Sequence, residues 1–209
     1  ADPLTMGFEV NIAGHAAGSP ASYYGKNNFG NKPDGKSPLA AVPGLEKYHG
    51  TDTFLSEALT LEAMKALDKA QQKNEPFFLY MAHYAIHTPI QPDYRFYQKY
   101  LDKGLPPVEA AYATLIEGMD KSLGDLMNYL EENKLTDNTI IIFMSDNGGL
   151  SAAGTGRGGE ANTHNLPLKS GKGSAYEGGI REPMIVSWPG VTQPSSRCDR
   201  YLLAEDYFP

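Results

Sequence analysis

The sequence predicts an α/β fold in which a mainly parallel sheet is flanked by helices. Two short apolar runs, at residues 77–82 and 140–144, lie on either side of a long stretch with helical periodicity at 107–132. The second run has no polar interruption, which is typical of a strand covered on both faces. A strand, a helix and a strand in this order form a right-handed βαβ unit, so the two strands are expected to be parallel.

The other elements follow from local patterns along the chain. A helix is expected to begin at Asp52 or Thr53 and to end before Pro76, because its apolar residues recur at helical spacing: Leu55, Leu59, Ala63, Ala66 and Ala70. The buried stripe of the 107–132 helix is predicted to be Tyr112, Leu115, Met119, Leu123, Leu126 and Leu130. Residues 183–188 predict a third buried strand, and a further helix is expected to begin near Tyr201. Residues 1–51 are rich in Gly, Pro, Asn and Tyr and predict a loop, with a solvated loop favoured over a cleft.

Composition narrows the class of protein. The 209 residues suit a single domain at 1–209, and a chain without a start methionine that stops as an element begins is interpreted as a fragment of a longer protein. A formal net charge of -7 argues against nucleic acid as a partner. No apolar run is long enough to span a membrane, and no basic patch suits a membrane surface. The single cysteine, Cys198, leaves the redox compartment undetermined.

Polar residues follow both strands of the predicted βαβ unit. His87 lies beyond the first strand, and Asp146 and Asn147 follow the second in Ser145-Asp-Asn-Gly-Gly149. The carboxyl ends of parallel strands open on one edge of a sheet, where ligands bind. Carboxylate and amide oxygens suit Ca²⁺ or Mg²⁺, whereas a zinc site would be expected to place a histidine beside the aspartate. The alternative is that Asp146 and Asn147 only form an Asx-Gly turn.

A Gly-rich segment at 148–182 leaves the same predicted edge and carries two lysines. It contains no P-loop pattern, so a phosphate cradle of that type is excluded. Lys172 has glycine on both sides, which lets the backbone approach a ligand closely, whereas Lys169 is expected to be a solvated charge. A hard cation, an imidazole and an ammonium together suit a tetrahedral oxyanion such as sulfate or phosphate.

Three segments of the chain resemble the type I sulfatase domain of the alkaline phosphatase-like superfamily. They are residues 77–91, the Ser145-Asp-Asn-Gly-Gly149 segment and residues 171–183, and the resemblance runs from about Gly7 to the C-terminus. It implies that Asp146 and Asn147 ligate Ca²⁺, in preference to Mg²⁺, and that His87 and Lys172 contact the sulfate and the ester oxygen. It also places His15 loosely in the substrate pocket. A periplasmic, secreted or lysosomal location is typical of the family.

The family's nucleophile is absent from this chain. Sulfatases convert Cys or Ser in a Cys/Ser-x-Pro-x-Arg motif to formylglycine, and no such motif occurs here; Cys198 stands in the wrong context. The nucleophile is therefore expected upstream, in the rest of the sulfatase chain, and the 209 residues alone are expected to be inactive.

The leading hypothesis is that the chain is part of a sulfuric ester hydrolase that acts on saccharide or small aryl sulfate esters. A phosphonate or phosphate ester hydrolase of the same superfamily would share every residue named above. A non-catalytic binding domain on the same scaffold is the remaining alternative.

Overall fold

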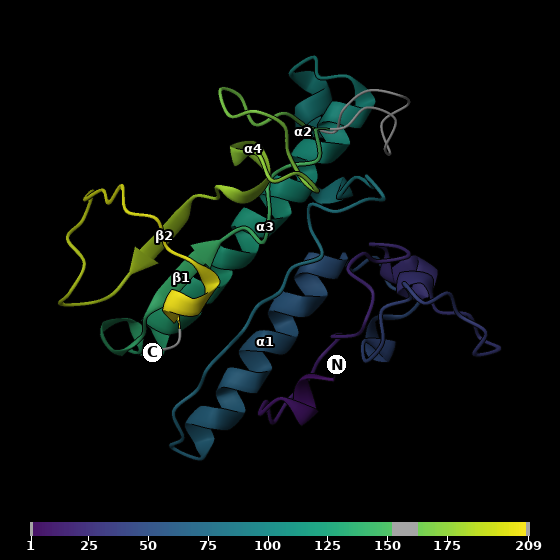
Figure 1. Ribbon diagram of the computed structural model, residues 1–209. Helices are drawn as coiled ribbons and strands as arrows, with labels where there is room; N and C mark the ends of the chain where they lie inside the picture. The colour runs from purple at the N-terminus through teal and green to yellow at the C-terminus, as the bar shows by residue number, and fades with distance from the viewer. Residues whose placement is uncertain (1, 152–162, 208–209) are drawn as a thin grey trace.

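The computed structural model describes residues 2–151 and 163–207. Two long helices, α1 (Leu55–Gln72) and α3 (Pro107–Glu132), pack against each other, and α2 (Tyr94–Asp102) packs on α3. Most of the N-terminal region lies at the start of α1, its first residues lie beside the later part of α1, and a small sheet lies along α3 (Figure 1). A one-turn helix, α4 (Glu177–Ile180), precedes the second strand of that sheet. No described helix is long and apolar enough to cross a membrane.

The helix predicted from Asp52 or Thr53 is α1, which ends at Gln72 as its sequence indicates. Asn74 adopts a left-handed conformation with φ 55°, and the amide of Glu75 donates to the carbonyl of Ala70 at 3.0 Å. This is a Schellman arrangement, which satisfies the last carbonyl groups of a helix, and Pro76 then prevents the helix from continuing. Local signals therefore determine where α1 ends.

The helix α3 has the predicted bounds, but its buried face is shifted toward small residues. Leu115 and Leu130 are buried as expected, whereas Tyr112, Met119, Leu123 and Leu126 are half-buried. The buried positions also include Ala110, Ala111, Thr114, Gly118 and Ser122. Small side chains let α1 approach closely, and Thr60 of α1 meets Ser122 in a buried hydroxyl pair at 2.5 Å.

The sheet among the described residues has two strands, β1 (Ile141–Met144) and β2 (Met184–Ser187), and they are antiparallel. Both strands lie within the apolar runs that predict them. The expected parallel partner of β1 is absent, because residues 77–82 form no strand with described residues. The expected burial on both faces is also not observed: Ile142 is 51% exposed and Met144 45% exposed. Of the four residues of β1, only Ile141 packs against the helices, in a cluster with Leu67 of α1 and Tyr129 and Leu130 of α3.

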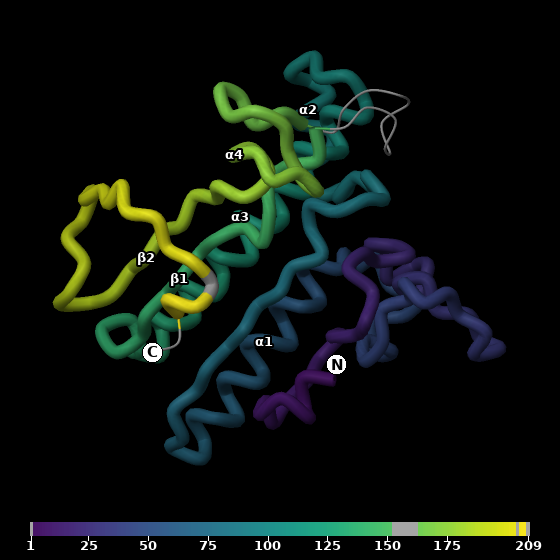
Figure 2. The backbone as a smooth tube through the Cα atoms, in the orientation of Figure 1, coloured from purple at the N-terminus to yellow at the C-terminus, as the bar shows by residue number. Residues whose placement is uncertain are grey.

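Residues 77–82 nevertheless have the alternation of a strand. Phe77 and Leu79 pack against the C-terminal halves of α1 and α3, in the same cluster as Ile141. The residues between and after them are exposed: Phe78 by 79% and Tyr80 by 71%. Their backbone makes no hydrogen bond to other described residues. Residues 77–82 and β1 run in the same direction along the helices (Figure 2). The predicted parallel orientation is therefore present without direct pairing.

The N-terminal 51 residues are irregular, as predicted, but they are not a solvated loop. They contain three short 3₁₀ helices, at Pro3–Thr5, Gly25–Gly30 and Glu46–Tyr48. Fully buried side chains from this region form much of the main core with the start of α1: Tyr23, Phe29, Val42 and Leu45. The ring of Tyr23 stacks on Phe54, with centroids 5.3 Å apart. The tail forms a 3₁₀ helix at Ala204–Tyr207 in place of the predicted α-helix.

Candidate functional site

The loop that carries His87 is attached to the N-terminal core through Tyr23. The phenol oxygen of Tyr23 lies 2.7 Å from the carbonyl oxygen of Tyr84 and 2.8 Å from that of His87, so its one proton is shared between them. Burial raises the pKa of Tyr23 and keeps the phenol protonated. The Nδ1 atom of His87 lies 3.1 Å from the carbonyl oxygen of Thr88. The Nε2 atom is therefore the ring nitrogen left for a ligand.

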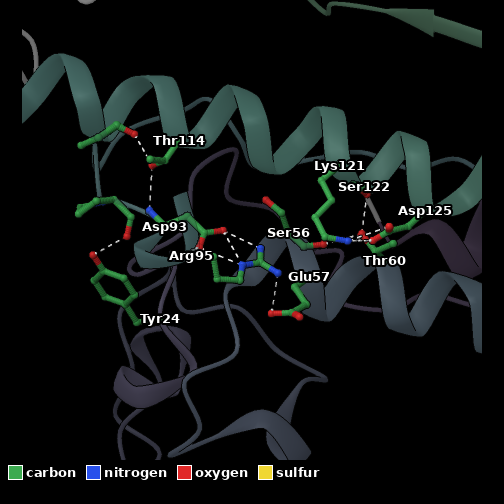
Figure 3. A network of polar contacts seen from close by, with 12 residues as sticks. Tyr24, Ser56, Glu57, Thr60, Asp93, Arg95, Thr114, Lys121, Ser122 and Asp125 are labelled. Carbon is green, nitrogen blue, oxygen red and sulfur yellow. Dashed lines mark hydrogen bonds and ion pairs between the residues drawn. The ribbon is translucent and has the colours of Figure 1, made fainter. Parts of the chain in front are cut away.

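A buried ion pair fixes the other end of this loop (Figure 3). The side chain of Asp93 is 2% exposed and accepts from Arg95 Nη2 at 2.6 Å, and Arg95 Nη1 lies 2.9 Å from Glu57 of α1. The amide of Asp93 donates to the hydroxyl of Thr114 on α3 at 2.9 Å. The loop at residues 83–92 is thus joined to both long helices, and a carboxylate as buried as that of Asp93 would be costly to leave without its cationic partner.

His15 lies beside the same loop. Its ring stacks on Tyr84 with centroids 5.7 Å apart, and the Tyr84 hydroxyl donates to the carbonyl of Ala13 at 2.7 Å. The amide of Ala17 donates to Nδ1 of His15 at 3.1 Å, so the proton of the neutral ring is on Nε2. Burial lowers the pKa of His15, and Nε2 is buried without a hydrogen-bond partner among the described residues. A cavity of about 330 Å³ opens here, lined by Asp2, Pro3, Asn11, Gly14, His15 and Ala16.

Asp146 and Asn147 follow β1 in a turn that packs tightly on the start of α4. The amide of Gly148 donates to the carbonyl of Gly179 at 3.2 Å. A β-carbon at Gly148 would overlap the carbonyl oxygen of Gly178, so only glycine fits there. Asp146 is exposed and Asn147 is half-buried. The turn is therefore fixed by backbone contacts while its carboxylate remains accessible.

A second carboxylate lies opposite Asp146. The antiparallel register pairs Met144 with Met184, so Asp146 and Glu182, each two residues further out, lie on the same face at the end of the ladder. Burial, and then the charge of Asp146, raise the pKa of Glu182. The Oε1 atom of Glu182 is buried without a hydrogen-bond partner among the described residues. Glu182 was not predicted as a site residue, because the sequence does not indicate the antiparallel pairing of β1 and β2.

The two lysines of the Gly-rich segment have different surroundings. The amide of Lys172 donates to the carbonyl of Gly149 at 3.1 Å, which attaches Lys172 to the turn carrying Asp146. Its ammonium group is exposed and has no partner in the described part of the chain. The ammonium nitrogen of Lys169 lies 3.9 Å from the centre of the Tyr176 ring, in a cation–π contact. Residues 152–162 of this segment lie outside the described residues.

The predicted site residues therefore form two groups. Backbone contacts bring Lys172 to the turn of Asp146 and Asn147, and Tyr84 joins His15 to the loop of His87. No hydrogen bond or ion pair between described residues links one group directly to the other. The placement of His87 on the same edge as Asp146 remains a prediction.

The amino-acid sequence matches a known protein family over nearly the whole chain. A family model described as Sulfatase matches residues 5–209. The chain belongs to the sulfatase family. This sulfatase chain is 31% identical over 205 residues to the N-acetylgalactosamine-6-O-sulfatase of Bacteroides thetaiotaomicron, covering 94% of the chain and 38% of that protein. It is 35% identical over 158 residues to a protein named Sulfatase from Formosa agariphila, covering 70% of the chain and 27% of that protein.

Solved structures agree with the family and confirm the alkaline phosphatase-like fold expected from the sequence. The crystal structure of Ps i-CgsB superposes with a TM-score of 0.61 at 35% identity, over 74% of this chain and 33% of that one. The same protein in complex with k-i-k-neocarrahexaose gives a TM-score of 0.58 at 37% identity, over 68% of this chain and 30% of that one. The sulfatase chain thus spans about a third of the length of these relatives.

The donors at the end of β1 fit a hard cation in type but are too few to bind one alone. The carboxylate of Asp146, the amide of Asn147 and the unpartnered oxygen of Glu182 are all oxygen donors, which Ca²⁺ prefers. Among residues 2–151 and 163–207, no group of three or more His, Cys, Asp or Glu side chains is arranged to hold a metal ion. A Ca²⁺ ion at this turn would need further oxygen donors besides these three, because Ca²⁺ takes about six to eight oxygen ligands.

Proposed function

We propose that this chain is part of the catalytic domain of a sulfatase that hydrolyses sulfate esters of saccharides. In this proposal Asp146 and Asn147 hold Ca²⁺, and a formylglycine nucleophile is supplied by a part of the protein outside this sequence. The observation that carries the proposal is the 3.1 Å bond from the Lys172 amide to the Gly149 carbonyl. It attaches the backbone of Lys172, whose ammonium has no partner among the described residues, to the turn that carries the metal-ligand candidates. A cation and an ammonium together suit a sulfate group.

Each residue has a role that follows from its chemistry. The ammonium of Lys172 offsets negative charge that grows on the ester oxygen as the bond to sulfur breaks. When both ring nitrogens of His87 are protonated, Nδ1 donates to the Thr88 carbonyl and Nε2 donates to a sulfate oxygen or to the departing oxygen. Ca²⁺, when bound, offsets sulfate charge and orients the group for attack.

The substrate class is inferred from relatives and from the N-terminal cavity. One similar protein is an N-acetylgalactosamine-6-O-sulfatase, and another was solved in complex with k-i-k-neocarrahexaose. The cavity is lined by the polar residues Asp2, Asn11 and His15, a set that suits the hydroxyl groups of a saccharide.

The function is tested by measuring which anion the complete protein releases. We expect release of inorganic sulfate from sulfated galactosamine or galactan oligosaccharides in the presence of Ca²⁺, detected by ion chromatography. The matched phosphate monoesters should be hydrolysed far more slowly. Faster release of phosphate than of sulfate would favour the phosphate ester hydrolase, and release of neither anion would favour the non-catalytic binding domain.

The proposed role of His15 predicts a change in affinity that depends on the size of the substrate. His15→Ala should raise KM for a sulfated oligosaccharide by about 10-fold, the equivalent of one lost hydrogen bond of about 1.4 kcal/mol. A small aryl sulfate does not extend into the cavity, so its KM should stay within two-fold of the parent. Steady-state kinetics of both substrates provides the comparison. Equal changes in KM for the two substrates would show that His15 does not contact the saccharide.

A further inference from the structure

Asn165 connects the turn of Asp146 and Asn147 to the loop that leads to Lys172. Its Oδ1 atom accepts from the amide of Gly149 at 3.0 Å, and its Nδ2 atom donates to the carbonyl of Gly149 at 3.0 Å. The Nδ2 atom also donates to the carbonyl of Ser170 at 3.0 Å. One side chain therefore bonds both backbone groups of Gly149 and, at the same time, the backbone two residues before Lys172.

The carbonyl of Gly149 is where these contacts meet. It accepts from Asn165 Nδ2 and from the amide of Lys172, at 3.0 and 3.1 Å, which occupies both of its lone pairs. The space around it is filled: a β-carbon at Gly171 would overlap the Gly149 carbonyl oxygen and lie 2.6 Å from Asn165 Nδ2. The glycine before Lys172 is therefore required so that the lysine loop can approach this carbonyl.

We propose that Asn165 is a positioning residue for the reaction: it fixes the ammonium of Lys172 relative to the cation and sulfate held at Asp146 and Asn147. This inference rests on the proposed function. Asn165 acts through the backbone of Gly149 and Lys172 and does not touch the substrate. A carboxamide is required because the site needs one acceptor for the Gly149 amide and two donors for the carbonyls of Gly149 and Ser170.

The main test is Asn165→Asp in the complete protein, which keeps the shape and the acceptor but loses both donated bonds. We expect kcat on a sulfate ester to fall by about 10- to 100-fold, since a displacement of about 1 Å in a reacting group has an effect of this size. KM should change by less than about three-fold, because ground-state contacts are untouched. Asn165→Ala, which loses all three bonds, should change kcat in the same direction.

Asn31 provides the matched control. Its Nδ2 atom also donates to two backbone carbonyls, of Asn28 at 2.9 Å and Val42 at 2.6 Å, but it lies in the N-terminal core. Asn31→Asp should therefore lower the melting temperature without lowering kcat of the folded enzyme. An equal loss of kcat in the two variants would mean that Asn165 has only a structural role and would overturn the proposal.

A double-mutant cycle with Lys172 separates positioning from a general effect. If Asn165 acts through Lys172, Asn165→Asp should change kcat by less than about two-fold in the Lys172→Ala background. Multiplication of the two single effects would refute the proposal. Hydrogen exchange gives a readout independent of activity: the amides of Gly149 and Lys172 should exchange faster in Asn165→Ala, which removes the acceptor of the Gly149 amide and both donated bonds, than in the parent. Unchanged exchange rates would contradict the proposed role of Asn165. Faster exchange in a protein that has no sulfate-ester activity would contradict only the proposed function.

Discussion

Replacing Lys172 with alanine in the complete protein is expected to lower kcat on a sulfate ester by about 30- to 1000-fold. This corresponds to about 2–4 kcal/mol of lost transition-state stabilisation, the size of effect seen when one donor to a developing oxyanion is removed. KM should change much less, because the charge that Lys172 offsets grows only as the ester bond breaks. The physical basis for this expectation is that Lys172 is attached through its backbone to the turn of Asp146, while its ammonium has no partner among residues 2–151 and 163–207.

Lys169 is the matched control, three residues earlier in the same loop. Its ammonium lies 3.9 Å from the centre of the Tyr176 ring, so its charge is already directed toward a described side chain. Lys169→Ala should therefore leave kcat within a few-fold of the parent and should lose only a modest cation–π contribution to stability. Steady-state kinetics on one sulfate ester compares the two variants. A larger loss of kcat for Lys169→Ala than for Lys172→Ala would show that the catalytic lysine has been misassigned.

The helices were predictable because their signals are local. Apolar spacing located α1 and α3, and the residues after Gln72 gave the end of α1 through Asn74 and Pro76. The short helix α2 was not predicted from the sequence, although it had local signals. Its aromatic and apolar residues recur at helical spacing in Tyr94, Tyr97 and Leu101, but none of them is buried. Asp93 after Pro92 caps the helix by accepting from the amide of Arg95 at 3.1 Å.

Strand pairing and the N-terminal core were not predictable in the same way. The apolar runs located β1 and β2, but which strands pair, and in which direction, depends on contacts far apart in sequence. Tyr23, Phe29 and Leu45 are fully buried although their segment is rich in glycine and proline and has no period. Burial of an irregular segment depends on what packs over it, and composition alone predicts a loop.

The sequence predicted several residues of the candidate site but not the hydrogen bonds that connect them. The sequence indicated Asp146, Asn147 and Lys172, and the structure adds the carbonyl of Gly149 as their shared point of attachment. Asn165 and Glu182 were not identified as contributors, because each acquires its position from a partner on another segment. Glu182, which precedes β2, faces Asp146, which follows β1, only because the two strands are antiparallel.

Replacing Asp146 with alanine is expected to have the largest effect of all. In the complete protein, Asp146→Ala should weaken Ca²⁺ binding and lower turnover by at least about 10³-fold, because the cation loses a charged ligand where it offsets sulfate charge. Asp137 serves as the control: it lies in the 3₁₀ helix Thr136–Asn138 just before β1 and is exposed. Asp137→Ala should leave both Ca²⁺ affinity and kcat unchanged.

The isolated chain offers a second measurement of the same site by calorimetry. Asp146 and Asn147, even with the unpartnered oxygen of Glu182, give too few donors for a calcium ion within the described residues. The 209-residue chain alone should therefore bind Ca²⁺ weakly, and addition of the complete protein's remaining segments should restore tight binding. Tight stoichiometric binding by the isolated chain would show that its ligands lie within this sequence. Full Ca²⁺ affinity in Asp146→Ala would show that the cation is held elsewhere, because no site that depends on a carboxylate ligand tolerates its loss.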